Sequence, residues 1–212
     1  MSSAIFVISV GTELKLLIDE LKIEFPKYCI VSASLRSERS IENIMQNLYD
    51  SNIKRIIIVP AFVYEGREYK RACDEVNKFK DKFKLSFITP LVTCYEDFFN
   101  IVNIISLNKN DIYCVHKSEI DLHVLMKNEF IWEIGRDCMP VVDDMISKKI
   151  SEVNVHPFML RTGYHVKNDI IELFKPELEK HGIDVNVVEK GLIDYSEIRN
   201  IFTDKIKEIE GK

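Results

Sequence analysis

The chain has 212 residues, of which 46% are hydrophobic and 30% are charged, and its formal net charge is -5 at pH 7. This composition is typical of a folded globular protein and excludes a disordered chain. The length suits one large domain or two small similar lobes. The negative charge argues against a nucleic-acid partner, because binding to phosphates needs a basic surface.

Cysteine use and the start of the chain indicate a compartment. The five cysteines contain no C-x-x-C pair, and an odd number suits the reducing cytosol; we expect them to be core residues. The apolar first residues lack the basic segment of a signal peptide and are followed by Glu13, so they predict a buried strand. No run approaches the ~20 apolar residues that cross a bilayer. We therefore expect a cytoplasmic protein without a membrane partner.

In the first half of the chain, short β-branched runs alternate with amphipathic stretches. The runs predict strands at Ala4–Val10, Tyr28–Ser34, Arg55–Ala61 and Leu85–Thr89. Apolar residues recur with the helical period between them, as at Leu14, Leu17, Ile18 and Leu21. The predicted helices are Glu13–Phe25, Ser40–Tyr49, Arg67–Phe79 and Tyr95–Ile105.

The second half repeats this alternation. It predicts strands at Asp111–His116, Phe130–Glu133, Val153–Val155 and Val185–Val188. The predicted helices are Ser118–Lys127, Val141–Lys149, Val166–His181 and Ser196–Ile209. Strands that alternate with helices indicate an α/β fold with parallel sheets covered on both faces.

The two halves also resemble each other in sequence. The segment from Pro60 to Lys70 and the segment from Pro157 to Lys167 place proline, glycine and lysine at the same positions, at a shift of 97 residues. This match predicts two similar lobes, each a parallel sheet flanked by helices, with a cleft between them. We place the first lobe at 1–107 and the second, which carries the reactive residues described next, at 108–212.

Three side chains that bind metals fall at consecutive strand ends of the second lobe. His116 ends its first predicted strand, Glu133 ends the second, and His165 follows the third at the start of a helix. Ligands of open parallel sheets bind at the carboxyl ends of the strands. Two imidazoles and one carboxylate suit Co²⁺, Fe²⁺, Ni²⁺ or Zn²⁺ and leave coordination positions open. The pattern therefore predicts a metal site.

Each of these residues also has a structural interpretation, because strand ends are exposed and collect polar residues. His116 is alternatively a hydrogen-bonded histidine at a strand end, Glu133 a solvated loop acid, and His165 a helix cap. Among the other histidines, His123 and His181 are interpreted as structural, and His156 stays ambiguous.

Nucleotide and hydrolase motifs are missing: the sequence has no G-x-G-x-x-G, P-loop or G-x-S-x-G. The loop from Ser9 through Gly11 to Thr12 follows the first strand and predicts an anion site formed by backbone N–H groups. The alternative is a tight turn with Thr12 as a helix N-cap.

The strongest family signature lies in the second half, where His156-Pro-Phe-Met-Leu-Arg-Thr-Gly-Tyr-His-Val-Lys-Asn-Asp169 resembles P-F-M-L-x-x-G-x-H-x-x-N-D. This is the signature of the anaerobic, class II sirohydrochlorin cobaltochelatases of the chelatase superfamily. Weaker similarities follow in order along the chain: Ser9–Thr12 to S-F-G-T, Ser34–Arg36 to T-S-R, Pro60–Tyr69 to P-x-x-x-x-x-G-x-E-Y, and Val185–Leu192 to the strand before K-G-L.

The resemblance implies a function and assigns roles. It implies an enzyme that inserts Co²⁺ into sirohydrochlorin in cobalamin biosynthesis, without ATP and without an organic cofactor. Its metal-binding and catalytic residues fall on His116, Glu133 and His165. The alternatives are insertion of Fe²⁺ or Ni²⁺ into a related tetrapyrrole, and a non-catalytic tetrapyrrole- or metal-binding relative.

The implied substrate is a small tetrapyrrole with many carboxylates, so a protein of negative net charge needs local cations. Arg36, Arg136 and Arg161 are the candidates, together with the Ser9–Thr12 loop; for each arginine, simple surface solvation is the alternative. A homo-oligomer is compatible with the sequence. The chain departs from the family around His116, where Val115 and Lys117 replace glycines and Ile120 replaces a histidine.

Overall fold

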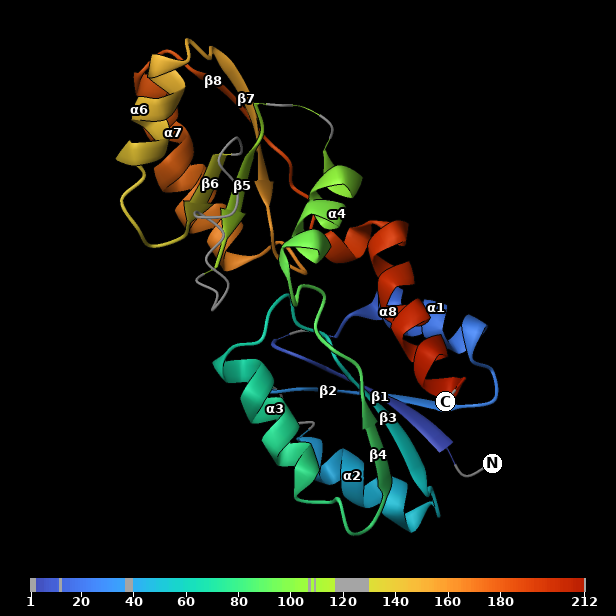
Figure 1. Cartoon of the computed structure of the whole chain (residues 1–212). Helices are drawn as coiled ribbons and strands as arrows, with labels where there is room; N and C mark the ends of the chain where they lie inside the picture. Colours follow the sequence, from blue (N-terminus) through green and yellow to red (C-terminus); the bar gives the residue numbers. More distant parts are fainter. Residues whose placement is uncertain are drawn as a thin grey trace. The chain divides into compact units, whose positions relative to one another are not determined.

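The computed structural model describes residues 3–11, 13–36, 40–106, 108, 110–116 and 130–211. The predicted helix Ser118–Lys127, with His123, and the loop residue Thr12 lie outside this part of the chain. The other predicted strands and helices are present, with ends that differ by a few residues (Figure 1). The predicted class is therefore confirmed: the fold has two four-stranded parallel sheets flanked by helices.

The first sheet has the strand order β2-β1-β3-β4. Its strands are β1 (Ser3–Ser9), β2 (Cys29–Ser34), β3 (Arg55–Pro60) and β4 (Lys84–Phe87). The central strands β1 and β3 are almost wholly buried because they are apolar on both faces. The helices that follow the first three strands are α1 (Lys15–Glu24), α2 (Ile41–Asp50) and α3 (Arg67–Asn77).

The second sheet has the corresponding order β6-β5-β7-β8. Its strands are β5 (Ile112–Val115), β6 (Phe130–Glu133), β7 (Glu152–Pro157) and β8 (Asp184–Val187). One face is covered by α6 (Met139–Ser147), the π-helix η1 (Val166–Phe174) and α7 (Lys175–Lys180), whose apolar side chains form one core with the sheet. In this core Trp132 stacks on Phe174 with 4.3 Å between ring centroids.

Equivalent backbone hydrogen bonds also occur in the two halves of the chain. The amide of Lys70 bonds to the carbonyl of Gly66, and the amide of Lys167 bonds to the carbonyl of Gly163. The turns before β3 and β7 both place a non-glycine residue at positive φ, with values of 61° for Asn52 and 57° for Lys149. Each of these pairs is separated by the same 97 residues as the two sequence motifs. The duplication read from the motifs therefore extends through the backbone of both halves.

The chain forms two compact units, which do not coincide with its two sequence halves. The first unit is Met1–Thr93 with Ser196–Lys212, and the second unit is Cys94–Tyr195. The first unit thus includes α8 (Ser196–Glu210), whose Arg199 bonds through Nε to Oε2 of Glu20 at 2.5 Å. The second unit includes α4 (Tyr95–Ile105).

The boundary predicted from the sequence, 107/108, instead places α4 in the first lobe and α8 in the second. Each half ends in an amphipathic helix, and periodicity along one helix does not identify the sheet that buries its apolar face. For α4 this sheet is the second one, because Phe98 stacks on Phe158 with 4.4 Å between ring centroids.

The predicted helix Val166–His181 begins with π-helical hydrogen bonds. The amide of Lys175 bonds to the carbonyl of Ile170, five residues earlier. The wider turn ends at α7, where Pro176 in the first turn has no N–H to donate. Such turns are rare and often occur at functional sites. Here the π-helix starts immediately after His165.

Two remaining expectations concern the cysteines and the membrane. The expectation of core cysteines is correct for Cys114, where burial raises the pKa of the thiol well above its usual value. It is wrong for Cys29 and Cys94, which are exposed, because Cys29 opens an edge strand and Cys94 precedes a helix. Across the described residues, no helix has both the length and the apolar character needed to span a bilayer.

Candidate metal centre

Two adjacent strands of the second sheet carry the candidate histidines. β5 and β7 pair in parallel, with Tyr113 opposite His156 and Cys114 opposite Pro157. His116 is the first residue after β5, and His165 follows β7 after a loop that ends at Gly163 and Tyr164. Because neighbouring parallel strands end at the same edge, the two histidines reach one end of the sheet.

The two imidazoles are in contact. The ring centroids of His116 and His165 lie 4.5 Å apart, and the ring planes are nearly perpendicular at 83°. This contact joins residues 49 positions apart in the sequence. Because imidazole nitrogens bind first-row metals at ~2 Å, two rings this close can share one ion after rotation about their side-chain torsions.

Asp169 holds the ring of His165. Its Oδ2 atom lies 2.6 Å from Nδ1 of His165, across one turn of helix. A carboxylate on one ring nitrogen fixes the orientation of the imidazole and leaves the other nitrogen for a metal or a proton. The nitrogen of His165 that is left for such a role is therefore Nε2. A role for Asp169 was not predicted from the sequence, although its i+4 spacing from His165 within the family motif was a usable signal.

The electrostatic environment of His116 favours its neutral form. Partial burial of the imidazole lowers its pKa, because the loss of water disfavours the charged form, although the residue as a whole is exposed. The neighbouring His165 lowers the pKa further, while Asp169 acts in the opposite direction. A neutral imidazole has the lone pair that metal binding needs.

Glu133 lies on the neighbouring strand, but its carboxylate has another partner. In the register of β5 and β6 it stands opposite Val115, the residue before His116. Its Oε1 accepts from Nε of Arg136 at 2.9 Å, and its side chain is 13% exposed. Within the described ranges, no three His, Cys, Asp or Glu side chains gather closely enough to hold a metal ion. The histidines are thus brought together, while Glu133 as the third ligand stays a prediction.

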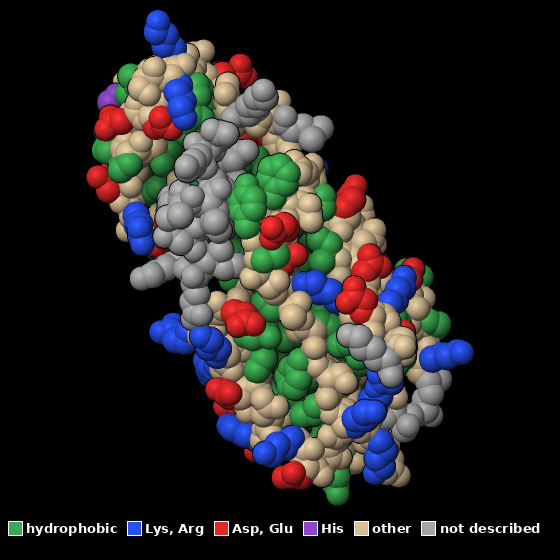
Figure 2. Space-filling model, in the orientation of Figure 1, with side chains coloured by type: hydrophobic (Ala, Val, Ile, Leu, Met, Phe, Trp, Pro, Cys, Tyr) green, Lys and Arg blue, Asp and Glu red, His purple; other side chains and the backbone are tan. Residues whose placement is uncertain are grey.

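The candidate substrate-binding residues are divided between the two units. Arg136 and Arg161 are exposed in the second unit. Arg36 is exposed in the first unit, and its amide bonds to Oγ of Ser34. The surface in Figure 2 shows Lys and Arg side chains among Asp and Glu side chains. Roles for these arginines stay predictions.

The loop after β1 has the geometry of a turn. Ser9 is buried and its carbonyl accepts from the amide of Leu35, while Gly11 adopts a φ of 90° that favours glycine. Thr12 lies beyond the described part of this loop. The anion-binding role of Ser9, Gly11 and Thr12 therefore stays a prediction.

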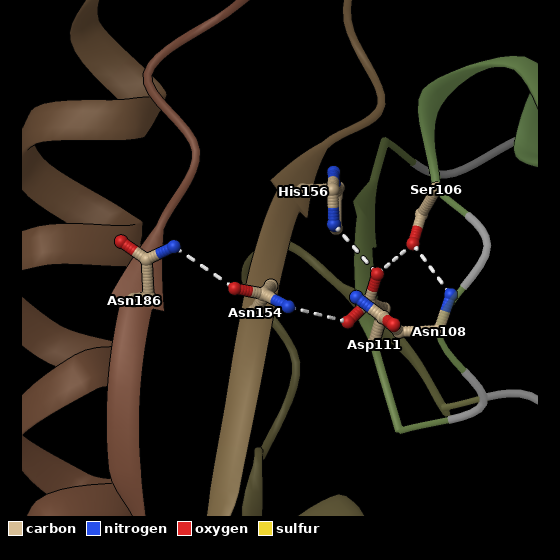
Figure 3. Close-up of polar contacts among 6 residues, drawn as sticks. All are labelled: Ser106, Asn108, Asp111, Asn154, His156 and Asn186. Atoms are coloured by element: carbon tan, nitrogen blue, oxygen red, sulfur yellow. Dashed lines mark hydrogen bonds and ion pairs between the residues drawn. The ribbon is translucent and has the colours of Figure 1, made fainter.

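His156, which the sequence left ambiguous, belongs to a buried polar network (Figure 3). Its Nε2 lies 2.9 Å from Oδ2 of Asp111, which also accepts from Oγ of Ser106. The other carboxylate oxygen accepts from Asn154, which in turn accepts from Asn186. The network crosses from β5 over β7 to β8. It ties together β5 and β7, the strands that precede His116 and His165.

A surface depression lies at the other end of the second sheet. Its volume is about 600 Å³, and its lining includes Asn110, Lys148 and Glu152. These residues come just before β5 and at the start of β7, so the depression is at the amino ends of the strands, away from the histidines. It is not the candidate metal centre.

Comparison with known proteins gives a sequence match and a fold match. The sequence model of the cobalt chelatase (CbiK) family matches residues 123–210, which is less than half of the chain and includes His165 but not His116. A search of curated proteins found no significant match.

Solved structures match nearly the whole chain at low identity. SirB from Bacillus subtilis, solved with Fe³⁺, has a TM-score of 0.61 and 14% identity, with 98% of this chain and 95% of SirB covered. The sirohydrochlorin chelatase SirB from Bacillus subtilis subspecies spizizenii, in complex with cobalt, has a TM-score of 0.63 and 14% identity over the same shares. DR2241 from Deinococcus radiodurans, a multi-domain protein with structural similarity to chelatases, has a TM-score of 0.64 and 8% identity, with 95% of this chain and 54% of DR2241 covered.

These similarities agree with the motifs around His165. Because the identities are low, the solved structures establish the fold, and the sequence match adds a similarity to the cobalt chelatase family over the C-terminal part. The chain therefore has the fold of these chelatases, and its residues 123–210 are similar in sequence to the cobalt chelatase (CbiK) family.

Proposed function

We propose that this protein is a sirohydrochlorin cobaltochelatase, which inserts Co²⁺ into the tetrapyrrole without ATP. The observation that carries the proposal is the contact between His116 and His165, whose ring centroids lie 4.5 Å apart at the carboxyl ends of two paired strands. The C-terminal match to the cobalt chelatase family supports the choice of metal. The relative in complex with cobalt supports both the metal and the ring.

The histidines perform two tasks in this mechanism. Insertion of Co²⁺ replaces two pyrrole N–H protons, so the reaction needs a metal carrier and two proton acceptors. The neutral imidazoles first bind the ion through nitrogen lone pairs. When the ion moves to the ring nitrogens, the vacated imidazoles accept the two protons. Asp169 keeps Nε2 of His165 directed to this exchange through its 2.6 Å hydrogen bond to Nδ1.

Glu133 and the arginines complete the proposed site. Glu133 offsets the charge of the ion and takes up protons after exchanging its bond to Arg136. Arg136 and Arg161 bind the peripheral carboxylates of the ring, since guanidinium groups pair with carboxylates through two hydrogen bonds. The same chemistry makes Arg36 and the Ser9–Thr12 loop candidates for carboxylate binding in the first unit. We expect the protein to act in the cytoplasm and in cobalamin biosynthesis.

Two other functions have specific support. One relative was solved with Fe³⁺, which favours a ferrochelatase as the second candidate. The types of the ligands do not distinguish cobalt, iron and nickel, because sites with nitrogen and oxygen ligands generally rank these metals in the same order of affinity. Val115 and Lys117 replace the family's glycines on either side of His116. This departure favours a relative that binds the ring or the metal without turnover.

The test is an anaerobic insertion assay. Purified protein is mixed with sirohydrochlorin and Co²⁺, Fe²⁺ or Ni²⁺ in the absence of ATP, and the absorption spectrum of the tetrapyrrole is followed. We expect the fastest change with Co²⁺, well above the rate without protein. A faster reaction with Fe²⁺ would replace cobalt by iron. Ring binding without acceleration by any of the three metals would contradict enzymatic function and favour a binding protein.

A further inference from the structure

Tyr164 is an exposed aromatic residue between the glycine loop and the metal-binding histidine. Its relative exposure is 73%, the second highest among the large exposed hydrophobic side chains described. Neither the metal centre nor the core uses this side chain. Single exposed apolar residues are common, so exposure alone assigns no role. The position and orientation of the ring provide the further evidence.

The backbone holds Tyr164 in a defined place. Its carbonyl accepts from Nδ2 of Asn168 at 2.8 Å, one turn into the helix that His165 begins. Its ring lies edge-on to the ring of His165, with centroids 5.6 Å apart and planes at 88°. The ring of Tyr164 therefore lies beside the imidazole that we propose as the metal carrier.

This angle is compatible with stacking on a tetrapyrrole. An imidazole binds a metal along a direction in its own plane, so a macrocycle that receives the ion from His165 lies perpendicular to that imidazole. The ring of Tyr164 is also nearly perpendicular to the imidazole. The tyrosine ring therefore becomes parallel to the macrocycle by a single rotation about the normal of the imidazole plane. Parallel, offset rings are a favoured arrangement of aromatic systems.

Among the described residues, the backbone beside Tyr164 has free space around it. A Cβ atom placed on Gly163 would have no described atom within 4 Å. The glycine is exposed, as is Arg161 two residues before it, which has a charge suited to carboxylates. The segment from Arg161 to His165 thus combines a cation, an unobstructed backbone, an aromatic face and a metal ligand.

We propose that Tyr164 stacks on the tetrapyrrole and positions its centre over Nε2 of His165. This inference rests on the proposed function, since it requires a planar macrocyclic substrate. Tyr164 contacts the substrate and takes no part in metal binding. Its removal therefore weakens the binding of the ring and leaves the affinity for free Co²⁺ unchanged.

The experiment separates ring binding from metal binding. Metal-free sirohydrochlorin is titrated into the whole protein and followed by its fluorescence; Co²⁺ alone is titrated separately and followed by its visible absorption. We expect Tyr164→Ala to weaken ring binding about tenfold and to leave Co²⁺ binding within about twofold. Tyr164→Phe keeps the aromatic face and should bind the ring as the wild type does.

Leu173→Ala is the matched control, because Leu173 is apolar and 64% exposed on the helix that follows Tyr164. It should leave ring binding unchanged. Equal ring binding by wild type and Tyr164→Ala would overturn this inference while leaving the proposed function intact. Loss of Co²⁺ binding in Tyr164→Ala would also overturn it, because the residue would then support the metal site. If the wild type binds no ring, the proposed function fails as well.

Discussion

The two units have the same sheet order and different chemistry at the same places. The strand registers make Val10, Ser34 and Glu68 of the first unit equivalent to His116, Glu133 and His165 of the second. Glu68 is held by Arg67 and Arg71, with N–O distances of 3.3 and 3.7 Å. The shared backbone therefore does not require metal ligands at its strand ends, and the chemistry depends on substitutions at a few positions.

The same comparison applies to the sheet interior. The second unit places Asp111, Asn154 and His156 where the registers place Ile5, Ile57 and Val59 in the first unit. The three apolar residues are fully buried. The backbone thus accommodates either an apolar layer or a hydrogen-bonded network, and the network occurs in the unit with the candidate metal centre.

The largest expected effect is the loss of activity in His165→Ala. This change removes the Nε2 that we propose as metal ligand and proton acceptor, so insertion of Co²⁺ should fall to the rate without protein. The measurement is the anaerobic absorption assay, with circular dichroism to verify folding. His181→Ala is the control histidine, because His181 lies at the end of α7 beside Glu177.

Glu68→Ala sharpens this comparison of the units. Because Glu68 pairs with two arginines and has no metal-binding partner among its described contacts, we expect insertion to stay within a few-fold of the wild type. A loss as large as that of His165→Ala would show that the first unit also takes part in the reaction.

The next effect concerns stability. Asp111 is 1% exposed and accepts hydrogen bonds from His156, Asn154 and Ser106. Asp111→Ala leaves these donors without their acceptor, and a buried donor left without a partner costs about 1–3 kcal/mol. Chemical denaturation followed by far-UV circular dichroism measures this change.

The double variant Asp111→Ile/His156→Val tests whether the network can be exchanged for the apolar layer of the first unit. It removes both partners of the pair, and we expect it to be more stable than Asp111→Ala, because replacement of a buried pair by apolar residues is often neutral. A double variant that is less stable than the single one would show that the second unit needs the network for its fold.

Much of this fold could be predicted because local sequence patterns determine its elements. The apolar run of β1 and the spacing of Leu14, Leu17 and Leu21 identify a buried strand and a helix without knowledge of their partners. The pair His116 and His165 was also predictable, since consecutive strand ends of a parallel sheet converge.

Other features depend on partners distant in the sequence. The network joins Asp111 to His156 across 45 positions, and no local pattern identifies this pairing. Periodicity likewise does not identify which sheet α4 and α8 cover. The π-helix after His165 has a wider turn than an α-helix, but its apolar residues keep a helical spacing, so the sequence predicts one continuous helix there.

Asp169→Ala should have a smaller effect than loss of His165 itself. The carboxylate orients His165 without binding the ion, and loss of such a partner typically reduces metal affinity about 10- to 100-fold. Asp169→Asn keeps an oxygen near Nδ1 and should retain more affinity. Titration with Co²⁺ measures both, and the visible spectrum reports whether the coordination changes. Unchanged affinity and spectrum in Asp169→Ala would contradict the positioning role.

Glu133→Gln should have a smaller effect than Asp169→Ala. The amide keeps the size of the side chain and loses its charge, so we expect weaker use of Co²⁺, about tenfold or less, with binding of metal-free sirohydrochlorin unchanged. The effect is small because the carboxylate already accepts from Arg136 and its contribution to the ion requires that bond to be exchanged. Glu177→Gln is the matched control, since Glu177 is also an ion-paired acid of the second unit, bonded to Lys180. If both variants use Co²⁺ as the wild type does, Glu133 is not a metal ligand, and the two histidines with Asp169 constitute the protein's part of the site.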